Sequence, residues 1–235
     1  TIYRNCPYQC RYCYVWRNKL FKYRVQQGKY DPVEEAKKYL NKEGRTIVVS
    51  FVSDPYPPHE KDYRLTRKVL EILAKNPRNR VLVLTKNPMI PYHYDKDLFI
   101  EHEHIWLGTT ITTLDPRKAH DLEPKAPSPS LRLAVLRWIH EEGVHTWLSI
   151  EPIIPNYTIP ENIITSTINY IDYYVLGAFN YTIQLGFKEI EAIKREWYNK
   201  HIPISIYILK QYNKPFFIKK ELKRYLECMT INIVL

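Results

Sequence analysis

Three cysteines close together near the start of the chain have the type and spacing that metal chemistry requires. They lie in the segment Cys6-Pro-Tyr-Gln-Cys10-Arg-Tyr-Cys13, a C-x3-C-x2-C spacing, and the fourth cysteine, Cys228, is far along the chain. Thiolates at this spacing can bind one metal centre together. Three protein ligands leave a coordination position open, and catalytic metal sites keep such a position for the reacting molecule.

Two kinds of metal centre fit the triplet. A structural zinc site takes four protein ligands, so Cys228, His59 or another distant side chain would have to complete it. Ferredoxin-type clusters also take four cysteines, whereas three on one loop suit a [4Fe–4S] cluster whose fourth iron binds a non-protein ligand. A disulfide is disfavoured, because the tight loop offers no obvious pairing and the chain shows no secretory segment. The cluster is favoured, with zinc or metal-free thiols as alternatives.

The triplet followed directly by an aromatic residue, Tyr14, resembles the signature of the radical S-adenosylmethionine (radical SAM) superfamily. The resemblance implies that Cys6, Cys10 and Cys13 hold a [4Fe–4S] cluster whose open iron binds SAM. It further implies cleavage of SAM to methionine and a 5′-deoxyadenosyl radical, which takes a hydrogen atom from a substrate. An electron donor of the flavodoxin or ferredoxin type is then an expected partner.

Later segments narrow the resemblance to one branch of the superfamily. They lie at 51–60, 81–86, 107–113, 123–129 and 149–155. In this order they resemble the spore photoproduct lyase-like group, often labelled DNA repair photolyase, over about residues 1–180. This branch implies a nucleic acid or nucleotide as substrate.

Strands and helices alternate along the chain in the manner of an α/β protein. Apolar and β-branched runs predict strands at 46–52, 81–85, 104–111, 144–150, 172–176 and 202–209. Capped or amphipathic segments between them predict helices at 33–42, 63–75, 128–143, 161–168 and 187–198. Such alternation predicts a parallel sheet, which right-handed crossovers curl toward a barrel.

The resemblance makes this fold a partial (β/α)6 barrel of the TIM-like radical SAM type. Its edge strand would lie upstream of Thr1 or be lost. Residues 1–209 are expected to form the barrel, and 210–235 a short C-terminal extension rich in basic and aromatic residues.

Polar residues close several of the predicted strands, at the end where barrel enzymes build their active sites. Ser53 and Asp54 stand where the superfamily receives the SAM amino group, and Lys86 resembles a carboxylate-binding lysine of the branch. By the same resemblance Thr110 and Thr112 are candidates to bind the ribose.

Glu151, which ends another strand, is a further candidate for cofactor binding, and Tyr14 is expected near the adenine. In spore photoproduct lyase, tyrosines that flank the cluster take part in the radical relay, so the resemblance makes Tyr12 and Tyr14 catalytic candidates. A polar residue after an apolar strand can equally cap the next helix, and Thr-rich strands are common.

One position departs from the lyase pattern. In the lyase a cysteine three residues before the Asp of the Ser-Asp pair returns a hydrogen atom to the product, and here that position is Phe51. The departure weakens thymine-dimer reversal as the activity but leaves the SAM chemistry untouched.

The overall charge favours polyanionic partners. The net charge is +10 and the pI about 9.3, which suits nucleic acid but also serves solubility. In the tail, six basic residues alternate with aromatic ones, a combination that fits phosphate contacts and base stacking. These basic residues are Lys210, Lys214, Lys219, Lys220, Lys223 and Arg224. The solvated face of a terminal helix is the competing interpretation.

Other features give weaker expectations. The tract Glu101-His-Glu-His104 resembles a metal-binding sequence but precedes a strand, so we expect it on the opposite rim of the barrel. No apolar run reaches about 18 residues, which predicts a cytoplasmic protein without a membrane span. The alternative to an enzyme is a basic nucleic-acid-binding protein whose cysteine loop holds zinc or a non-catalytic cluster.

Overall fold

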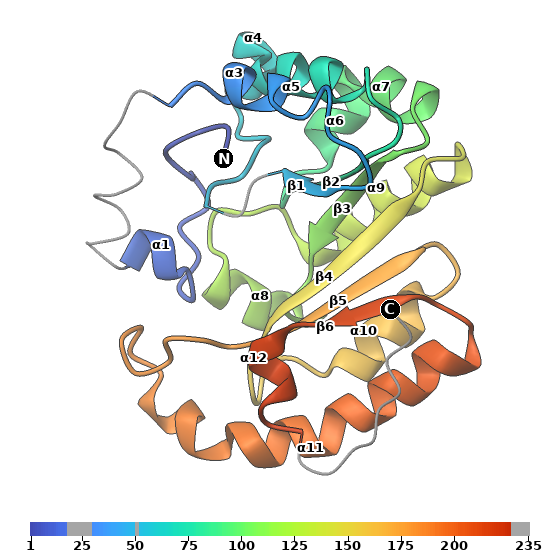
Figure 1. Cartoon of the computed structure of the whole chain (residues 1–235). Coiled ribbons are helices and arrows are strands. Elements are labelled where there is room, and N and C mark those ends of the chain that lie inside the picture. Colours follow the sequence, from blue (N-terminus) through green and yellow to red (C-terminus); the bar gives the residue numbers. More distant parts are fainter. Residues whose placement is uncertain (18–29, 50–51, 227–235) are drawn as a thin grey trace.

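A computed structural model describes residues 1–17, 30–49 and 52–226 of the chain (Figure 1). Its strands form one sheet in which all neighbouring strands are parallel and follow one another in chain order. The strands are β1 (Thr46–Val49), β2 (Arg80–Leu84), β3 (Ile105–Thr110), β4 (Thr146–Ile153), β5 (Tyr173–Ala178) and β6 (Phe216–Ile218). The sheet curls into a half-barrel with helices on its outside, which confirms the predicted α/β partial barrel.

Helices lie before, between and after the strands, and those between the strands cover the outer face of the sheet. They are α1 (Tyr14–Arg17), α3 (Pro32–Lys37), α4 (Glu60–Tyr63), α5 (Leu65–Leu73), α6 (Met89–Tyr94), α7 (Lys96–Glu101), α8 (Pro116–Leu122), α9 (Pro129–Glu141), α10 (Pro160–Thr167), α11 (Lys188–Gln211) and α12 (Lys220–Lys223). Three of them begin with a side-chain cap followed by proline, at Asp31, Asp115 and Ser128. These caps satisfy backbone N–H groups that the first helical turn leaves without partners.

The two faces of the sheet carry separate apolar clusters, as a parallel sheet buried on both sides requires. Residues such as Val83, Leu107 and Leu148 face the helices and join the main core. The inner face carries a smaller cluster around Leu82, Trp147 and Val175. The register places these inner residues in line with the strand-end positions that were predicted to form the site.

Trp147 fills the inside of the half-barrel below the strand ends. Its indole lies where Gly108 on β3 has no side chain, because a Cβ there would stand 2.4 Å from Trp147 Nε1. The indole N–H donates to the Val83 carbonyl at 3.1 Å. The tryptophan thereby forms a floor inside the half-barrel.

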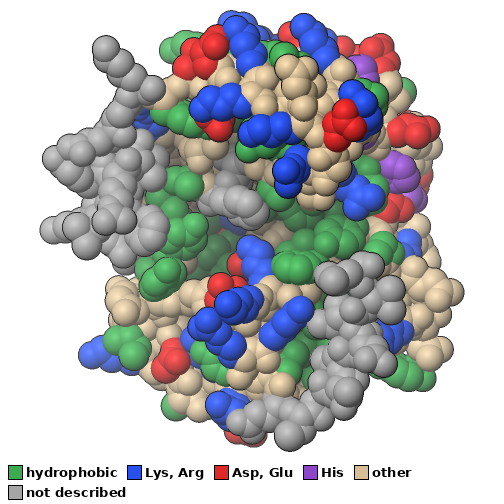
Figure 2. All heavy atoms as spheres, viewed as in Figure 1, with side chains coloured by type: hydrophobic (Ala, Val, Ile, Leu, Met, Phe, Trp, Pro, Cys, Tyr) green, Lys and Arg blue, Asp and Glu red, His purple; other side chains and the backbone are tan. Residues whose placement is uncertain are grey.

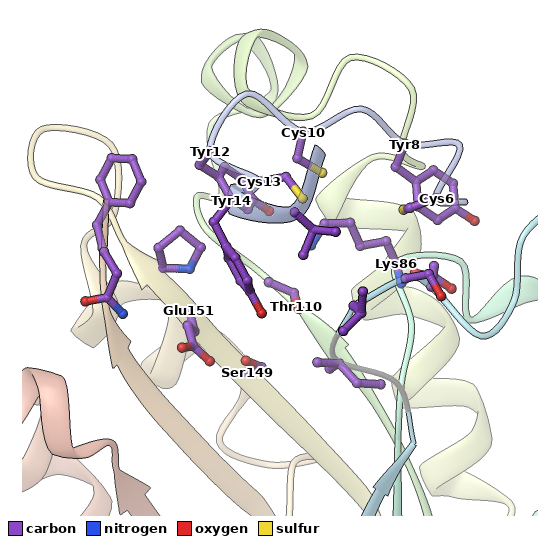
Figure 3. A pocket seen from close by; sticks show the side chains of 18 of the residues that line it. Cys6, Tyr8, Cys10, Tyr12, Cys13, Tyr14, Lys86, Thr110, Ser149 and Glu151 are labelled. Atoms are coloured by element: carbon purple, nitrogen blue, oxygen red, sulfur yellow. The ribbon is translucent and has the colours of Figure 1, made fainter. Parts of the chain in front are cut away.

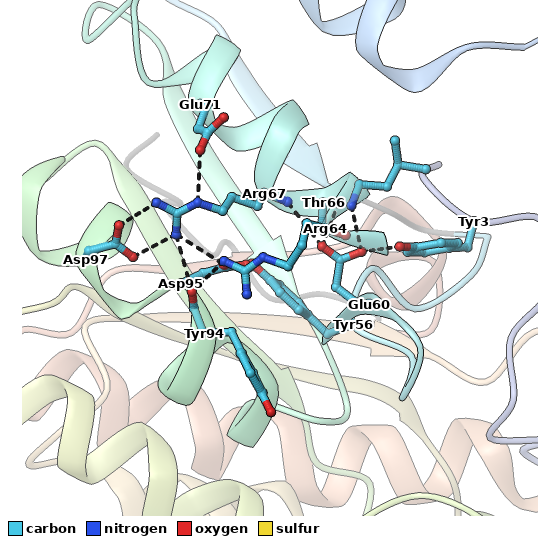
Figure 4. Close-up of polar contacts among 11 residues, drawn as sticks. Tyr3, Tyr56, Glu60, Arg64, Thr66, Arg67, Glu71, Tyr94, Asp95 and Asp97 are labelled. Carbon is cyan, nitrogen blue, oxygen red and sulfur yellow. Dashed lines mark hydrogen bonds and ion pairs between the residues drawn. The ribbon is translucent and has the colours of Figure 1, made fainter. Parts of the chain in front are cut away.

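A polar network at the outer edge ties the start of the chain to α5 (Figure 4). The buried Glu60 carboxylate accepts hydrogen bonds from the backbone N–H groups of Thr66 at 2.8 Å and Arg67 at 3.2 Å, and from the Tyr3 hydroxyl. Negative charge at the first turn of a helix is stabilising. Since Tyr3 stands shortly before Cys6, this network fixes the approach to the cysteine loop.

The predicted strand at 202–209 is wrong, because these residues belong to the long helix α11. Their buried side chains, Ile202, Ile206 and Leu209, recur at helical spacing, whereas Ile204 and Tyr207 are exposed. The run of β-branched residues favoured a strand locally, but packing against the core selected the helix. Pro203 stands inside the helix.

The sixth strand lies instead at Phe216–Ile218, within the segment predicted as an extension. It pairs with β5 and is followed by Lys219 and the short helix α12. A further edge strand upstream of Thr1 stays a prediction. Among the described residues, no helix combines the length and apolar character needed to cross a membrane.

Candidate functional site

A cavity of about 460 Å³ lies at the C-terminal ends of the strands, with the cysteine loop on one side of it (Figure 3). The space-filling view shows a hollow on this face of the molecule, with basic side chains gathered below it over the C-terminal elements (Figure 2). Among the residues that line it are the predicted ones Cys6, Cys10, Tyr12, Cys13, Tyr14, Ser53, Asp54, Lys86, Thr110 and Glu151. Residues from all parts of the sheet therefore meet at one place, as the strand-end pattern predicted.

The three thiols all face this cavity. Cys10 is buried, and the Cys13 N–H donates to the Cys10 carbonyl at 3.0 Å, which closes a turn between them. Burial raises the pKa of Cys10 to about 12 and also raises the pKa of Cys6, so without a metal both stay protonated at neutral pH. As the described side chains stand, no group of three or more His, Cys, Asp or Glu residues is arranged to hold a metal ion.

The donor set fits an iron–sulfur cluster in its chemistry. Thiolate is the usual protein ligand of such clusters, and three thiols border a cavity that can receive a further, non-protein ligand. The cysteine loop is also anchored from behind, because the Arg11 N–H donates to the Leu122 carbonyl at 2.8 Å and the Tyr8 hydroxyl to the Tyr56 carbonyl at 3.0 Å. These contacts hold the loop at the cavity without using the thiols.

A buried group of charged side chains forms the wall behind Cys10. Glu123 is almost fully buried and pairs with the equally buried Arg132, and it accepts a hydrogen bond from the Tyr12 hydroxyl. Lys86 Nζ stands 3.4 Å from Glu123 Oε1 and 5.5 Å from the centre of the Tyr12 ring. Arg132 also donates to the Thr110 carbonyl at 2.7 Å. The group links the cysteine loop to the ends of β2 and β3.

The charges in this group determine its protonation. Burial alone would raise the pKa of Glu123, but Lys86 and Arg132 together hold it below its ordinary value. Burial alone would lower the pKa of Lys86, and Glu123 reverses that direction, so the lysine pKa is raised. The site therefore presents a charged lysine beside the cysteines, as binding a carboxylate requires.

Asp54 connects two strand ends rather than facing the cavity with free oxygens. Its Oδ1 accepts from the Tyr56 N–H at 2.9 Å and from the Thr85 hydroxyl at 2.7 Å, and its Oδ2 from the Lys86 N–H at 2.7 Å. The neighbouring Ser53 hydroxyl donates to the Tyr3 carbonyl. Asp54 thus holds the backbone that presents Lys86, a role the sequence did not predict.

The opposite wall is formed by β4, β5 and β6. Glu151 Oε2 lies 2.5 Å from the ammonium of Lys219, which comes directly after β6. Tyr14 packs beside Tyr181, with ring centres 5.7 Å apart, at the same side of the cavity. In Figure 3, Glu151 and Lys86 lie on opposite sides of Tyr14.

Some sequence-based expectations lie outside the site or outside the described residues. Thr112 is buried and does not line the cavity, whereas Thr110 does. Phe51, the departure from the lyase pattern, and Cys228, the zinc alternative's fourth ligand, lie outside the described residues. The tract from Glu101 to His104 lines a different cavity of about 600 Å³, beside the N-terminal ends of β2 and β3.

Sequence reasoning missed three residues of the two walls. Glu123 stood in one of the family-like segments but received no role, and Arg132 was interpreted only as part of a helix. Lys219 was assigned to a basic tail. Neither residue type signals its pairing locally. Arg132 stands nine residues after Glu123 but on the following helix, and Glu151 lies far from Lys219 in the sequence.

The fold and the cysteine-lined cavity define the class of protein, an α/β half-barrel with a cysteine loop at the rim where the strands end. The chain belongs to the radical SAM superfamily, whose family model matches residues 1–163.

Two relatives in sequence are similar over different lengths. The uncharacterized protein MJ0683 of Methanocaldococcus jannaschii is 33% identical over 190 residues, which cover 79% of this chain and 71% of that protein. The uncharacterized protein ORF301 of Acidianus two-tailed virus is 32% identical over 121 residues, 51% of this chain and 38% of the viral protein.

Two solved structures share the fold. SuiB of Streptococcus suis bound to S-adenosylmethionine superposes with a TM-score of 0.64 at 14% identity, over 92% of this chain and 48% of that one. A spore photoproduct lyase variant with bound AdoMet and dinucleoside spore photoproduct gives 0.58 at 15% identity, over 89% and 72%. At these identities the similarity concerns the fold alone, and the chain spans about half the length of SuiB.

Proposed function

We propose that this chain binds a [4Fe–4S] cluster through Cys6, Cys10 and Cys13 and binds SAM in the adjoining cavity. The observation that carries the proposal is that the three thiols and the strand-end residues line the same cavity. When held by these cysteines, a cluster would pass one electron from an external reductant to SAM. Cleavage would then give methionine and a 5′-deoxyadenosyl radical able to take a hydrogen atom from a substrate.

The residues of the chain have separable tasks in this scheme. Lys86 offers an ammonium to the carboxylate of SAM, and Glu123 and Asp54 hold that lysine in place. Thr110 and Glu151 offer oxygen atoms to hydroxyl or ammonium donors further along the cavity. Tyr14 and Tyr181 supply aromatic surface for the adenine. Tyr12 is held by Glu123 behind the loop, so among the two tyrosines Tyr14 is the better candidate for contact with a ligand.

The substrate that we propose is a nucleic acid or nucleotide. The net charge of +10 and the basic side chains below the hollow support it, since phosphate groups are attracted to such a surface (Figure 2). Replacement of Phe51 by Cys would be the first test for dimer-reversal activity, because it supplies the thiol that the lyase pattern has at that position.

The decisive experiment is anaerobic reconstitution with iron and sulfide, followed by dithionite and SAM. We expect an iron–sulfur absorption spectrum and formation of 5′-deoxyadenosine, detected by chromatography. The variant with Cys6, Cys10 and Cys13 all changed to Ala should give neither. A wild-type protein that shows the cluster spectrum but forms no 5′-deoxyadenosine would contradict the proposal.

The same preparation separates the enzyme from the zinc alternative. A zinc-binding protein would contain stoichiometric zinc after aerobic purification and would take up no iron anaerobically. Reduced flavodoxin or ferredoxin should replace dithionite in the assay, since we propose such a protein as the electron donor. Binding of single-stranded and double-stranded DNA and RNA at low and high salt then tests the proposed substrate class.

A further inference from the structure

An ion pair spans three strands at the end of the cavity that lies away from Lys86. Glu151 belongs to β4 and Lys219 follows β6, and β5 lies between these two strands in the sheet. The two charged atoms, Glu151 Oε2 and Lys219 Nζ, are nevertheless 2.5 Å apart. The glutamate side chain must therefore cross over β5 to reach the lysine.

Gly177 on β5 makes this crossing possible. A Cβ at that position would stand 2.6 Å from Glu151 Cδ and 2.7 Å from Glu151 Cγ, closer than real Cβ contacts. Glycine in a strand often marks a place where another group approaches closely. The missing side chain thus creates a groove across β5 in which the glutamate lies.

The pair fixes one carboxylate oxygen and leaves the other available. Glu151 Oε2 pairs with Lys219, while Oε1 takes no part in that pair and lies over Gly177, 2.8 Å from where a Cβ would stand. Both residues line the cavity, and their side chains are about a quarter exposed, at 26% for Glu151 and 25% for Lys219. Glu221, two residues further on, also lines the cavity. A carboxylate held at one oxygen can accept a hydrogen bond at the other from a hydroxyl or ammonium donor.

We propose that Lys219 is a positioning residue of the SAM site, which orients Glu151 so that Oε1 accepts a hydrogen bond from the nucleoside part of SAM. The lysine lies outside residues 1–163, so the site would be completed by a part of the chain beyond the family match. This inference rests on the proposed function. The nucleoside is the part concerned because Lys86 and the cysteines, which would take the methionine part, lie on the other side of Tyr14.

The test measures binding of SAM and of S-adenosylhomocysteine to the reconstituted protein by equilibrium dialysis. S-adenosylhomocysteine carries no net charge, so it separates positioning from long-range attraction or repulsion. We expect Lys219→Met to raise the Kd of both ligands at least about fivefold, in the range of one weakened hydrogen bond. Lys219→Arg, which keeps the charge, should stay within about twofold of the wild type.

Three further variants show whether the effect runs through Glu151. In the Glu151→Gln background, Lys219→Met should add nothing, because the carboxylate that it orients is gone. Gly177→Ala should weaken binding as Lys219→Met does, since its methyl group displaces Glu151. Lys220→Met is the matched control, because Lys220 is exposed and does not line the cavity, and it should bind like the wild type.

Several outcomes would overturn the inference. If Lys219→Met tightens SAM binding and leaves S-adenosylhomocysteine unchanged, the lysine acts only through its charge. An equal loss in the Glu151→Gln background would place its action elsewhere. A wild-type protein that binds neither ligand would refute the SAM site itself, whereas normal binding by Lys219→Met refutes only the role of the lysine.

Discussion

The two charged walls of the cavity are built in different ways. On one wall, Glu123 and Arg132 are each 1% exposed and lie among Lys86, Tyr12 and the strand ends. On the other, a single pair of Glu151 and Lys219 stands about a quarter exposed. The first wall is part of the folded core, while the second can exchange contacts with solvent or with a ligand.

This difference in burial should decide whether a substitution in a wall affects the stability of the fold or the binding of a ligand. Removing one partner of a buried ion pair leaves an uncompensated charge in a poorly solvated place. Removing one partner of a partly exposed pair costs much less, because water takes over. We therefore expect changes at the buried wall to affect stability first, and changes at the exposed wall to affect ligand binding.

The largest expected effect is on stability, from Glu123→Ala. The substitution leaves the buried charges of Arg132 and Lys86 without their carboxylate partner. We therefore expect the free energy of unfolding to fall by about 3–5 kcal/mol. Glu151→Ala should change it by less than about 1 kcal/mol. Urea unfolding followed by circular dichroism measures both, and equal losses would remove the distinction between the walls.

The pH dependence of stability sharpens this first test. The pKa of Glu123 is lowered in the folded chain, because Lys86 and Arg132 outweigh the opposing effect of burial. A carboxyl with a depressed folded pKa stabilises the fold above its unfolded pKa, about 4.3 for Glu, and this contribution is lost as the pH falls toward the folded value. The stability difference between wild type and Glu123→Gln should therefore be greatest near neutral pH and shrink in acid. A difference that grows in acid would contradict the assignment.

A second comparison uses the two inner-face glycines. Gly108→Ala places a methyl group 2.4 Å from the buried Trp147 ring, and overpacking of this kind should cost about 1–3 kcal/mol of stability. Gly177→Ala instead meets the side chain of Glu151, which can move. Its effect on stability should be the smaller of the two, while its effect on SAM binding should be the larger. Thermal unfolding and equilibrium dialysis on the same samples decide the order.

A third effect is expected from Lys86→Met. Under the proposed function the Lys86 ammonium faces the SAM carboxylate, so its loss should weaken SAM binding about tenfold, or about 1.4 kcal/mol. 5′-Deoxyadenosine has no carboxylate, so its affinity should stay near that of the wild type and serves as the control. A similar loss for both ligands would mean that the lysine supports the wall rather than the carboxylate.

The smallest expected effect is the salt dependence of the coupling energies of the two ion pairs, Glu151–Lys219 and Glu123–Arg132. Double-mutant cycles on the stability should give a Glu151–Lys219 coupling of about 0.2–1 kcal/mol at low salt. About 1 M salt, with a Debye length of about 3 Å, should largely remove it. The Glu123–Arg132 coupling should persist, because salt does not reach it. Equal salt sensitivity of the two couplings would show that the walls do not differ in solvent access.

Local sequence patterns predicted the cavity better than its walls. The cysteine spacing and the polar residues after apolar strands are short-range signals, and they placed Cys10, Lys86 and Glu151 correctly at one cavity. The pairing of Glu123 with Arg132, and of Glu151 with Lys219, depends on how strands and helices stack. No local pattern encodes that stacking.

Near the C-terminus, local sequence patterns also failed to predict the secondary structure correctly. The run 202–209 has strong strand propensity, yet it packs as the last part of α11. The true sixth strand has only three residues, Phe216–Ile218, which is too short for a periodic signal. Its assignment depends on the backbone partners that β5 offers, and Lys219 is placed at the cavity as a consequence.

The tryptophan floor of the half-barrel has a kinetic consequence under the proposed function. Trp147 is 2% exposed and packs against Gly108 beneath the strand ends, so its indole fills the inside of the half-barrel there. We therefore expect ligands to enter from the side of the cysteine loop. SAM, held at the strand ends, would lie deeper than a substrate that enters after it. Turnover should then follow a compulsory order of addition, with SAM first, and the nucleoside product should be the last to depart.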